Sequence, residues 1–165
     1  MNPRIYNVLF LCTGNSARSI LAEALLATIG RERFRAFSAG SHPNGNVQPI
    51  AAELAANLGY PAEHLRSKNW DEFAAAGAPD IDIVITVCDD AASEICPIWP
   101  GHPATAHWGV ADPVRADGGE EGKRRAFLAA FATLRRRVEL LVALPLDGLD
   151  RLAAQSHLRE IAKVV

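Results

Sequence analysis

A cysteine and an arginine separated by five residues, Cys12 and Arg18, give the strongest chemical signal in the sequence. A cysteine thiolate is a strong nucleophile, and the planar guanidinium of an arginine can hold two oxygens of a tetrahedral anion at once. The spacing therefore favours a site in which Cys12 faces the central atom of a phosphate-like oxyanion. The alternative is that Cys12 is a small, buried hydrophobic residue at the end of a strand.

The segment between these two residues has the composition of an anion-binding loop. It follows β-branched and aromatic residues over 5–11, which are typical of a buried strand, and from Ser19 the apolar residues recur with a helical period. Backbone N–H groups at such a junction converge on an anion, and the helix dipole adds partial positive charge. We expect the loop to bind the oxyanion through Thr13, Gly14, Asn15, Ser16, Ala17 and Arg18.

The same loop predicts how the cysteine is activated. Gly14 permits either a close approach of the backbone or a positive φ angle. The positive surroundings should lower the pKa of Cys12 from about 8.5 to roughly 3.5–7.5. We expect Ser19, or alternatively Ser16, to donate a hydrogen bond to the thiolate.

Two further cysteines, Cys88 and Cys96, indicate redox chemistry. The chain has three cysteines, no CxxC pair and no export signal, so catalytic or redox use is expected rather than a structural disulfide framework. Cys88 follows an apolar run over 81–87, which places it on the same carboxyl edge of a parallel sheet as Cys12. Seven mostly small or polar residues then lead to Cys96. Thiols deliver two electrons by forming a disulfide, so this arrangement favours a relay. For Cys88 taken alone, a buried structural cysteine is the alternative.

Strand-like and helix-like segments alternate along the chain. Strands are expected at 5–11, 34–39, 81–87 and 105–108, and helices from 19, over 49–59, over 119–144 and after Pro145. This alternation predicts a three-layer α/β fold with a parallel sheet between helices, in which ligands bind at the carboxyl ends of the strands. The length fits one domain over 1–165, with 145–165 as a C-terminal helical extension.

The composition excludes several classes of partner. The formal net charge is −2, so nothing indicates a nucleic-acid surface, and the basic clusters 123–125 and 135–137 fit the solvated face of a helix. No apolar run is long enough to cross a membrane, and no signal peptide is visible, so we expect a cytoplasmic protein. The five histidines lack the spacing of a zinc site, and no metal is expected.

Residues 8–19 resemble the signature of the low-molecular-weight protein tyrosine phosphatase superfamily and, more closely, the arsenate reductases that share its fold. The resemblance continues in Leu21-Ala22-Glu23, Phe37-Ser38-Ala39-Gly40, Thr86-Val87-Cys88-Asp89 and His107-Trp108-Gly109-Val110-Ala111-Asp112-Pro113. It implies a central four-stranded parallel sheet and a general acid–base role for Asp112. By itself, the pair Asp112-Pro113 indicates only a turn. The three cysteines resemble those of thioredoxin-coupled arsenate reductases, although seven residues between Cys88 and Cys96 is one more than in some relatives.

The resemblance implies an enzyme that reduces arsenate to arsenite for arsenic detoxification. Cys12 attacks arsenic, Cys88 resolves the adduct as a Cys12–Cys88 disulfide, and Cys96 moves this disulfide to the Cys88–Cys96 pair. Thioredoxin or glutaredoxin is the expected reductant, and no metal or organic cofactor is required. The main alternative is a tyrosine or small-molecule phosphatase, which the absence of an aromatic pair after Pro113 weakens. A regulatory oxyanion-binding module is the non-enzyme alternative.

Some relatives also bind a monovalent cation behind the anion loop. Asn15, Glu23 and Ser38 match three of its ligands, but Lys68 stands at the nearby acidic position. A lysine there would compete with a cation, so none is predicted.

Overall fold

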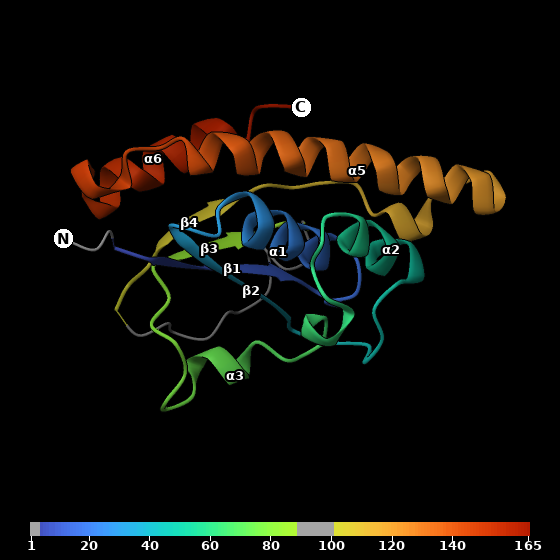
Figure 1. The fold of residues 1–165 in the computed structure, drawn as a ribbon, viewed down its shortest axis with the longest axis horizontal. Coiled ribbons are helices and arrows are strands. Elements are labelled where there is room, and N and C mark those ends of the chain that lie inside the picture. Colours follow the sequence, from blue (N-terminus) through green and yellow to red (C-terminus); the bar gives the residue numbers. More distant parts are fainter. Residues whose placement is uncertain (1–3, 89–100) are drawn as a thin grey trace.

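A single parallel sheet forms the centre of the computed structural model, which describes residues 4–88 and 101–165. The strands β1 (Tyr6–Cys12), β2 (Phe34–Gly40), β3 (Ile83–Thr86) and β4 (Ala104–His107) lie in the order β2-β1-β3-β4 (Figure 1). The prediction of a four-stranded parallel sheet in an α/β fold is confirmed. β3 is shorter than the apolar run at 81–87, and β4 lies one residue earlier than expected, so Trp108 follows the strand.

Helices cover both faces of this sheet. They are α1 (Arg18–Ile29), α2 (Pro49–Asn57), α3 (Asp71–Ala74), α5 (Gly119–Val142) and α6 (Arg151–Ile161), with short 3-10 turns η1 (Ala62–His64), η2 (Pro113–Arg115) and η3 (Leu146–Gly148). In Figure 1, α5 and α6 lie along one side of the sheet and α3 lies on the other. The four-residue helix α3 is too short for a sequence period to predict it.

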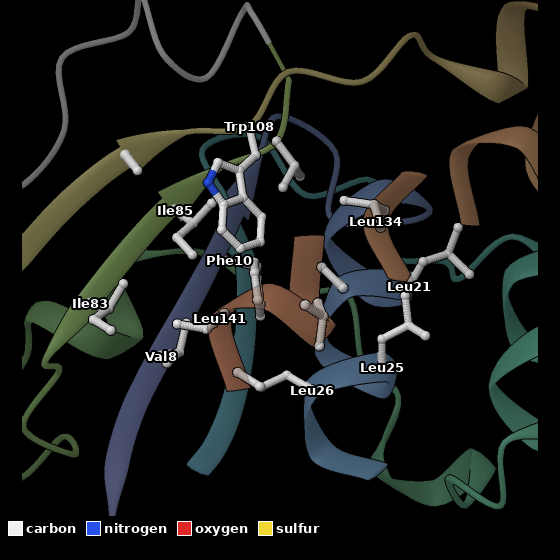
Figure 2. Packing of buried hydrophobic residues seen from close by; sticks show 14 of the residues in the cluster. Val8, Phe10, Leu21, Leu25, Leu26, Ile83, Ile85, Trp108, Leu134 and Leu141 are labelled. Atoms are coloured by element: carbon white, nitrogen blue, oxygen red, sulfur yellow. The ribbon is translucent and has the colours of Figure 1, made fainter. Parts of the chain in front are cut away.

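The alternation of side chains along β1 divides the core into two layers. Val8, Phe10 and Cys12 belong to the large cluster under α1 and α5, whereas Leu9 and Leu11 belong to a smaller cluster on the α3 side. This follows from the two-residue period of a strand. Figure 2 shows the large cluster, in which residues of β1 and β3 face leucines of α1 and α5 beside Trp108. The same alternation therefore turns the Cys12 side chain toward the start of α1.

The C-terminal helix α6 packs over β4. Its N-cap is Asp150, whose side chain accepts a hydrogen bond of 2.8 Å from the backbone N–H of Ala153, and its apolar face buries Leu158 and Ile161. The indole Nε1 of Trp108 donates a hydrogen bond of 2.9 Å to the carbonyl oxygen of Leu158. The C-terminal segment is thus attached to the chain directly after β4.

Candidate active site

The anion loop occupies the junction between β1 and α1. The helix begins at Arg18, one residue before the expected start, and its first turn is closed by a 2.9 Å hydrogen bond from the N–H of Leu21 to the carbonyl of Ala17. A pocket of about 300 Å³ opens here; it is lined by Cys12, Thr13, Gly14, Ser16, Ala17, Arg18, Asn44, Gln48, Asp112, Val114 and Arg115. The structure therefore brings the cysteine, the arginine and the aspartate of the sequence hypothesis to one cavity at the carboxyl end of the sheet.

The sulfur of Cys12 lies in a polar environment although the residue is only 3% exposed. The N–H of Asn15 donates a hydrogen bond of 3.2 Å to Cys12 Sγ, and the Ser19 hydroxyl lies 2.9 Å from the same atom. Of the two serines considered from the sequence, Ser19 is thus the one in contact with the sulfur. These contacts stabilise negative charge on the sulfur.

Asn15, and not Gly14, adopts the positive φ angle in this loop. Its φ is 46°, and its side chain is fully buried. The amide nitrogen donates to the hydroxyls of Ser19 and Ser38 at 2.8 and 3.0 Å, and the amide oxygen accepts from the N–H of Lys68 at 2.9 Å. Asparagine tolerates left-handed backbone better than most residues, and these three bonds hold it there. The suggestion of a positive φ at Gly14 is therefore wrong.

The loop needs a glycine on the neighbouring strand. Gly40 pairs with Cys12 in the parallel register, and a Cβ atom at this position would lie 2.4 Å from the carbonyl oxygen of Thr13. No side chain fits at that distance without moving the backbone of the anion loop. In the sequence, Gly40 appears only as part of the family resemblance; its close packing follows from the pairing of β1 with β2.

A buried charge network lies behind the loop. The Ser38 hydroxyl donates a hydrogen bond of 2.6 Å to one carboxylate oxygen of Glu23, the Tyr60 hydroxyl donates to the other, and the Lys68 ammonium lies 3.8 Å away. Burial raises the pKa of the Tyr60 hydroxyl, and the negative charge of Glu23 raises it further. Burial lowers the pKa of Lys68, an effect that Glu23 opposes. The network connects Glu23 through Ser38 and Asn15 to the anion loop.

Cys88 lies beside the anion loop. It is buried, the N–H of Thr13 donates a hydrogen bond of 3.2 Å to its sulfur, and its thiol also pairs with Cys12. The hydrogen bond with Cys88 raises the pKa of the Cys12 thiol well above its ordinary value, burial raises it further, and Ser19 lowers it. The expectation of a lowered pKa is therefore wrong for this arrangement, because it considered the loop and the helix dipole but not a second thiol in contact.

Arg18 links the pocket to the segment that carries Asp112. One guanidinium nitrogen donates a hydrogen bond of 2.9 Å to the carbonyl oxygen of Val110, and the other lies 3.6 Å from Asp112 Oδ2. Asp112 Oδ1 accepts a hydrogen bond of 3.0 Å from the N–H of Val114 and caps η2. Asp112 thus forms the turn expected from an Asp-Pro pair and also lines the pocket, with its second oxygen directed at Arg18 and Arg115.

Three further sequence expectations concern Cys96, a metal site and a membrane span. Cys96 lies outside the described residues. Within 4–88 and 101–165, no group of three or more histidine, cysteine, aspartate or glutamate side chains is arranged to hold a metal ion. None of the helices in the same ranges combines the length and hydropathy of a membrane span.

The fold and this geometry define a class of α/β proteins that present a cysteine, an arginine and an aspartate to a tetrahedral oxyanion. A model of the low molecular weight phosphotyrosine protein phosphatase family matches residues 7–155, and the chain belongs to this family.

Within the family, the chain is similar to several arsenate reductases. The chain is 37% identical to the arsenate reductase of Bacillus subtilis (strain 168) over 70% of this chain and 80% of that protein. It is 32% identical to the arsenate reductase of Halalkalibacterium halodurans over 84% and 95% of the two chains. A solved structure described as an arsenate reductase in oxidized state has a TM-score of 0.67 at 25% identity, covering 84% of this chain and 98% of that one. The resemblance inferred from the sequence is confirmed.

Proposed function

We propose that this chain is an arsenate reductase in which Cys12 is the nucleophile and Cys88 resolves the covalent adduct. The observation that carries the proposal is the position of Cys88 beside the anion loop, where the N–H of Thr13 donates a hydrogen bond of 3.2 Å to the Cys88 sulfur. A hydrolase of this family needs one thiolate and a water molecule, whereas a reductase needs a second thiol to supply electrons. Cys88 would supply this second thiol, and the proposal is supported by the similarity of the chain to arsenate reductases.

The oxyanion substrate would bind to the N–H groups of the loop and to Arg18. The raised pKa of Cys12 means that the thiol must transfer its proton before attack, and an oxygen of the bound arsenate dianion can accept it. The thiolate then forms a sulfur–arsenic bond. One arsenic–oxygen bond breaks, and the oxygen leaves as water with a proton from Asp112, which is left ionised.

The reduction itself would be a thiol exchange at Cys12. The Cys88 thiolate attacks Cys12 Sγ, the sulfur–arsenic bond breaks, and its electron pair remains on arsenic as arsenite. Two thiols are oxidised to one disulfide while arsenic gains two electrons, so the step balances. Cys96 would then attack Cys88 and free Cys12. A dithiol protein such as thioredoxin or glutaredoxin would reduce the Cys88–Cys96 disulfide, which suits a reducing compartment such as the cytoplasm.

The phosphatase alternative uses the same Cys12, Arg18 and Asp112. The lining of the pocket argues against an aromatic ester as the main substrate, because its described residues include Asn44, Gln48 and Arg115 and no aromatic side chain. Weak hydrolysis of aryl phosphates is compatible with the proposal, since it requires only the loop, the acid and water.

The deciding experiment measures arsenate turnover with thioredoxin, thioredoxin reductase and NADPH, and aryl-phosphate hydrolysis on the same preparation. Cys12→Ser should abolish both reactions. Cys88→Ser should abolish arsenate turnover and spare hydrolysis. Cys96→Ser should permit about one turnover and accumulate a Cys12–Cys88 disulfide, identified by peptide mapping. Full arsenate turnover in both the Cys88 and the Cys96 variants would disprove the relay.

A second experiment tests the acid. Asp112→Asn should lower the rate by about 100- to 10,000-fold, the usual contribution of general acid–base catalysis, while binding of phosphate changes little. An unchanged rate and pH profile, measured where chemistry limits turnover, would leave Asp112 with its turn-capping role alone.

A further inference from the structure

The buried arginine Arg137 of α5 has a role that the proposed chemistry does not explain. Its residue is 4% exposed, and no ion pair within the described residues involves it. Its donors bind backbone carbonyls instead: Nε donates to Val164 at 2.9 Å and Nη1 to Gly109 at 3.3 Å. Burying a charged side chain is costly unless its hydrogen bonds are satisfied. Because the Arg137 guanidinium donates to the carbonyls of two separate segments, it links these segments to each other.

The two segments lie at functionally different places. Gly109 precedes Val110 and Asp112 in the stretch that enters the active-site pocket, whereas Val164 is next to the last residue of the chain. Arg18 holds the same stretch from the pocket side through the carbonyl of Val110. The residues 109–112, called here the acid-bearing stretch, therefore accept hydrogen bonds at two adjacent carbonyls. Arg18 donates from the pocket side and Arg137 from the opposite side.

Further contacts fasten the C-terminal segment to the chain between β4 and the acid. The Trp108 indole donates to the Leu158 carbonyl at 2.9 Å, and both residues are fully buried. At the start of the same region, the N–H of Thr105 donates to the side-chain oxygen of Gln155 at 2.9 Å. The C-terminal segment thus contacts the chain leading to Asp112 directly at two points, and at a third point, nearest to the acid, through Arg137 of α5.

The packing between residues 109–113 and α5 explains why a hydrogen bond from Arg137 would matter for the position of this segment. A cavity of about 430 Å³ lies between residues 109–113 and 116 and the helix α5, whose side of the cavity is lined mainly by alanines, and Val165 closes part of it. On the α5 side of this cavity, small side chains therefore give residues 109–113 few contacts. Only the Arg137 bridge spans from α5 to a backbone carbonyl of this stretch among the described hydrogen bonds.

We infer that the C-terminal segment 145–165, bridged through Arg137 to the Gly109 carbonyl, is a positioning device that holds Asp112 at the oxyanion pocket. The inference rests on the proposed role of Asp112 as the general acid. Arg137 does not contact the oxyanion site; it acts through the backbone of residues 109–112. Loss of the bridge should let this stretch move into the cavity and carry the carboxyl away from the departing oxygen.

The test combines turnover with hydrogen exchange. Arg137→Met keeps most of the apolar side chain but removes the donors, and deletion of residues 163–165 removes the Val164 acceptor while retaining the arginine. The matched control is Arg135→Met, because Arg135 is a more exposed arginine of the same helix that pairs only with Glu139 in the described ion pairs. Arg137→Lys, which can reach a single carbonyl, serves if the methionine variant does not fold.

Arg137→Met and the deletion should each lower the rate of the chemical step about tenfold or more and change phosphate affinity less than about threefold, while amide exchange over residues 109–112 accelerates. Arg135→Met should change none of these. In an Asp112→Asn background, the loss caused by Arg137→Met should shrink to less than about twofold, because residues that act as one unit are not additive.

Two results would overturn the inference: an unchanged rate in Arg137→Met, or an equal loss with and without Asp112, which would show a general structural role. The single variant Asp112→Asn tests the proposed role of the acid separately from the role of Arg137. If that single variant retains full activity, the proposed role of the acid fails first, and the exchange data still report whether Arg137 holds the stretch.

Discussion

Replacing Asn15 tests how the anion loop keeps its shape. Asn15→Ala would leave the N–H of Lys68 without its acceptor and would remove two bonds to the Ser19 and Ser38 hydroxyls. An orphaned buried donor costs about 1–3 kcal/mol, and each lost hydrogen bond about 0.5–1.5 kcal/mol. The left-handed backbone at φ 46° adds about 1–2 kcal/mol for a residue with a Cβ and no local hydrogen bonds. We expect a total loss of roughly 3–8 kcal/mol, a large fraction of the stability of a typical domain.

A second substitution at the same position separates the two causes. Asn15→Gly removes the same hydrogen bonds but relieves the backbone strain, at an entropic cost of about 0.4–1 kcal/mol in the unfolded chain. It should therefore recover at most about 1.5 kcal/mol of the loss seen with alanine. Urea unfolding of both variants, followed by circular dichroism, gives the two free energies directly. A loss below about 1 kcal/mol for alanine, or full recovery by glycine, would refute the claim that side-chain hydrogen bonds hold the loop.

Three other outcomes follow from contacts in and behind the pocket. Cys88→Ala removes the largest cause that raises the pKa of Cys12. Alkylation of Cys12 by iodoacetamide should then reach half of its maximal rate at a lower pH than in the parent protein. An unchanged pH–rate profile would mean that Cys88 does not control the ionisation of Cys12. Gly40→Ala should abolish phosphate binding and lower the unfolding midpoint, because the Cβ would lie 2.4 Å from a backbone carbonyl of the anion loop, whereas Gly148→Ala, where nothing lies within 4 Å, should be neutral. Burial lowers the pKa of Lys68 below 10.5, so just below that pH the unfolded chain binds a proton that the folded chain has lost. The free energy of unfolding of the parent, relative to Lys68→Met, should therefore rise toward pH 10.5 in urea titrations. A flat difference would mean that the Lys68 ammonium is solvated.

The sequence predicts the frame of the molecule because the frame depends on local patterns. Apolar strand-like runs and helical periods predict the four parallel strands and the helices α1, α2, α5 and α6, with boundaries wrong by one or two residues at most ends, whereas they do not predict α3 on the other face of the sheet. The strand-to-helix junction at residues 12–18 likewise follows from the chain's order. To predict these features, it is enough to know the periodicity of the apolar side chains and the positions of glycine and proline at the ends of helices and strands.

Contacts between distant segments explain where the sequence analysis failed. It considered a positive φ angle only at Gly14, as an alternative to close backbone approach, but the chain adopts this conformation at Asn15, whose side chain finds partners 4, 23 and 53 residues away. It predicted a lowered pKa for Cys12 from the anion loop and the helix dipole, which are next to Cys12 in the sequence. Cys88, which raises this pKa, comes near Cys12 only through the pairing of β1 and β3. Arg137 appeared to belong to a solvated basic cluster, yet the tail folds back and buries it.

Arg18 connects binding and proton transfer in one side chain. Its fork holds the Val110 carbonyl with one nitrogen and lies near the Asp112 carboxylate with the other, so both ends of the guanidinium are engaged by the stretch that carries the acid. An oxyanion that takes up either nitrogen must therefore compete with that stretch or share the guanidinium with it. The Asp112 pair is partly exposed, so releasing it costs about 1 kcal/mol or less, while a charge-assisted hydrogen bond from the same nitrogen to an oxyanion is stronger. The energetically favoured arrangement keeps the Val110 bond and gives the second nitrogen to the substrate, which frees the Asp112 carboxyl to approach the departing oxygen.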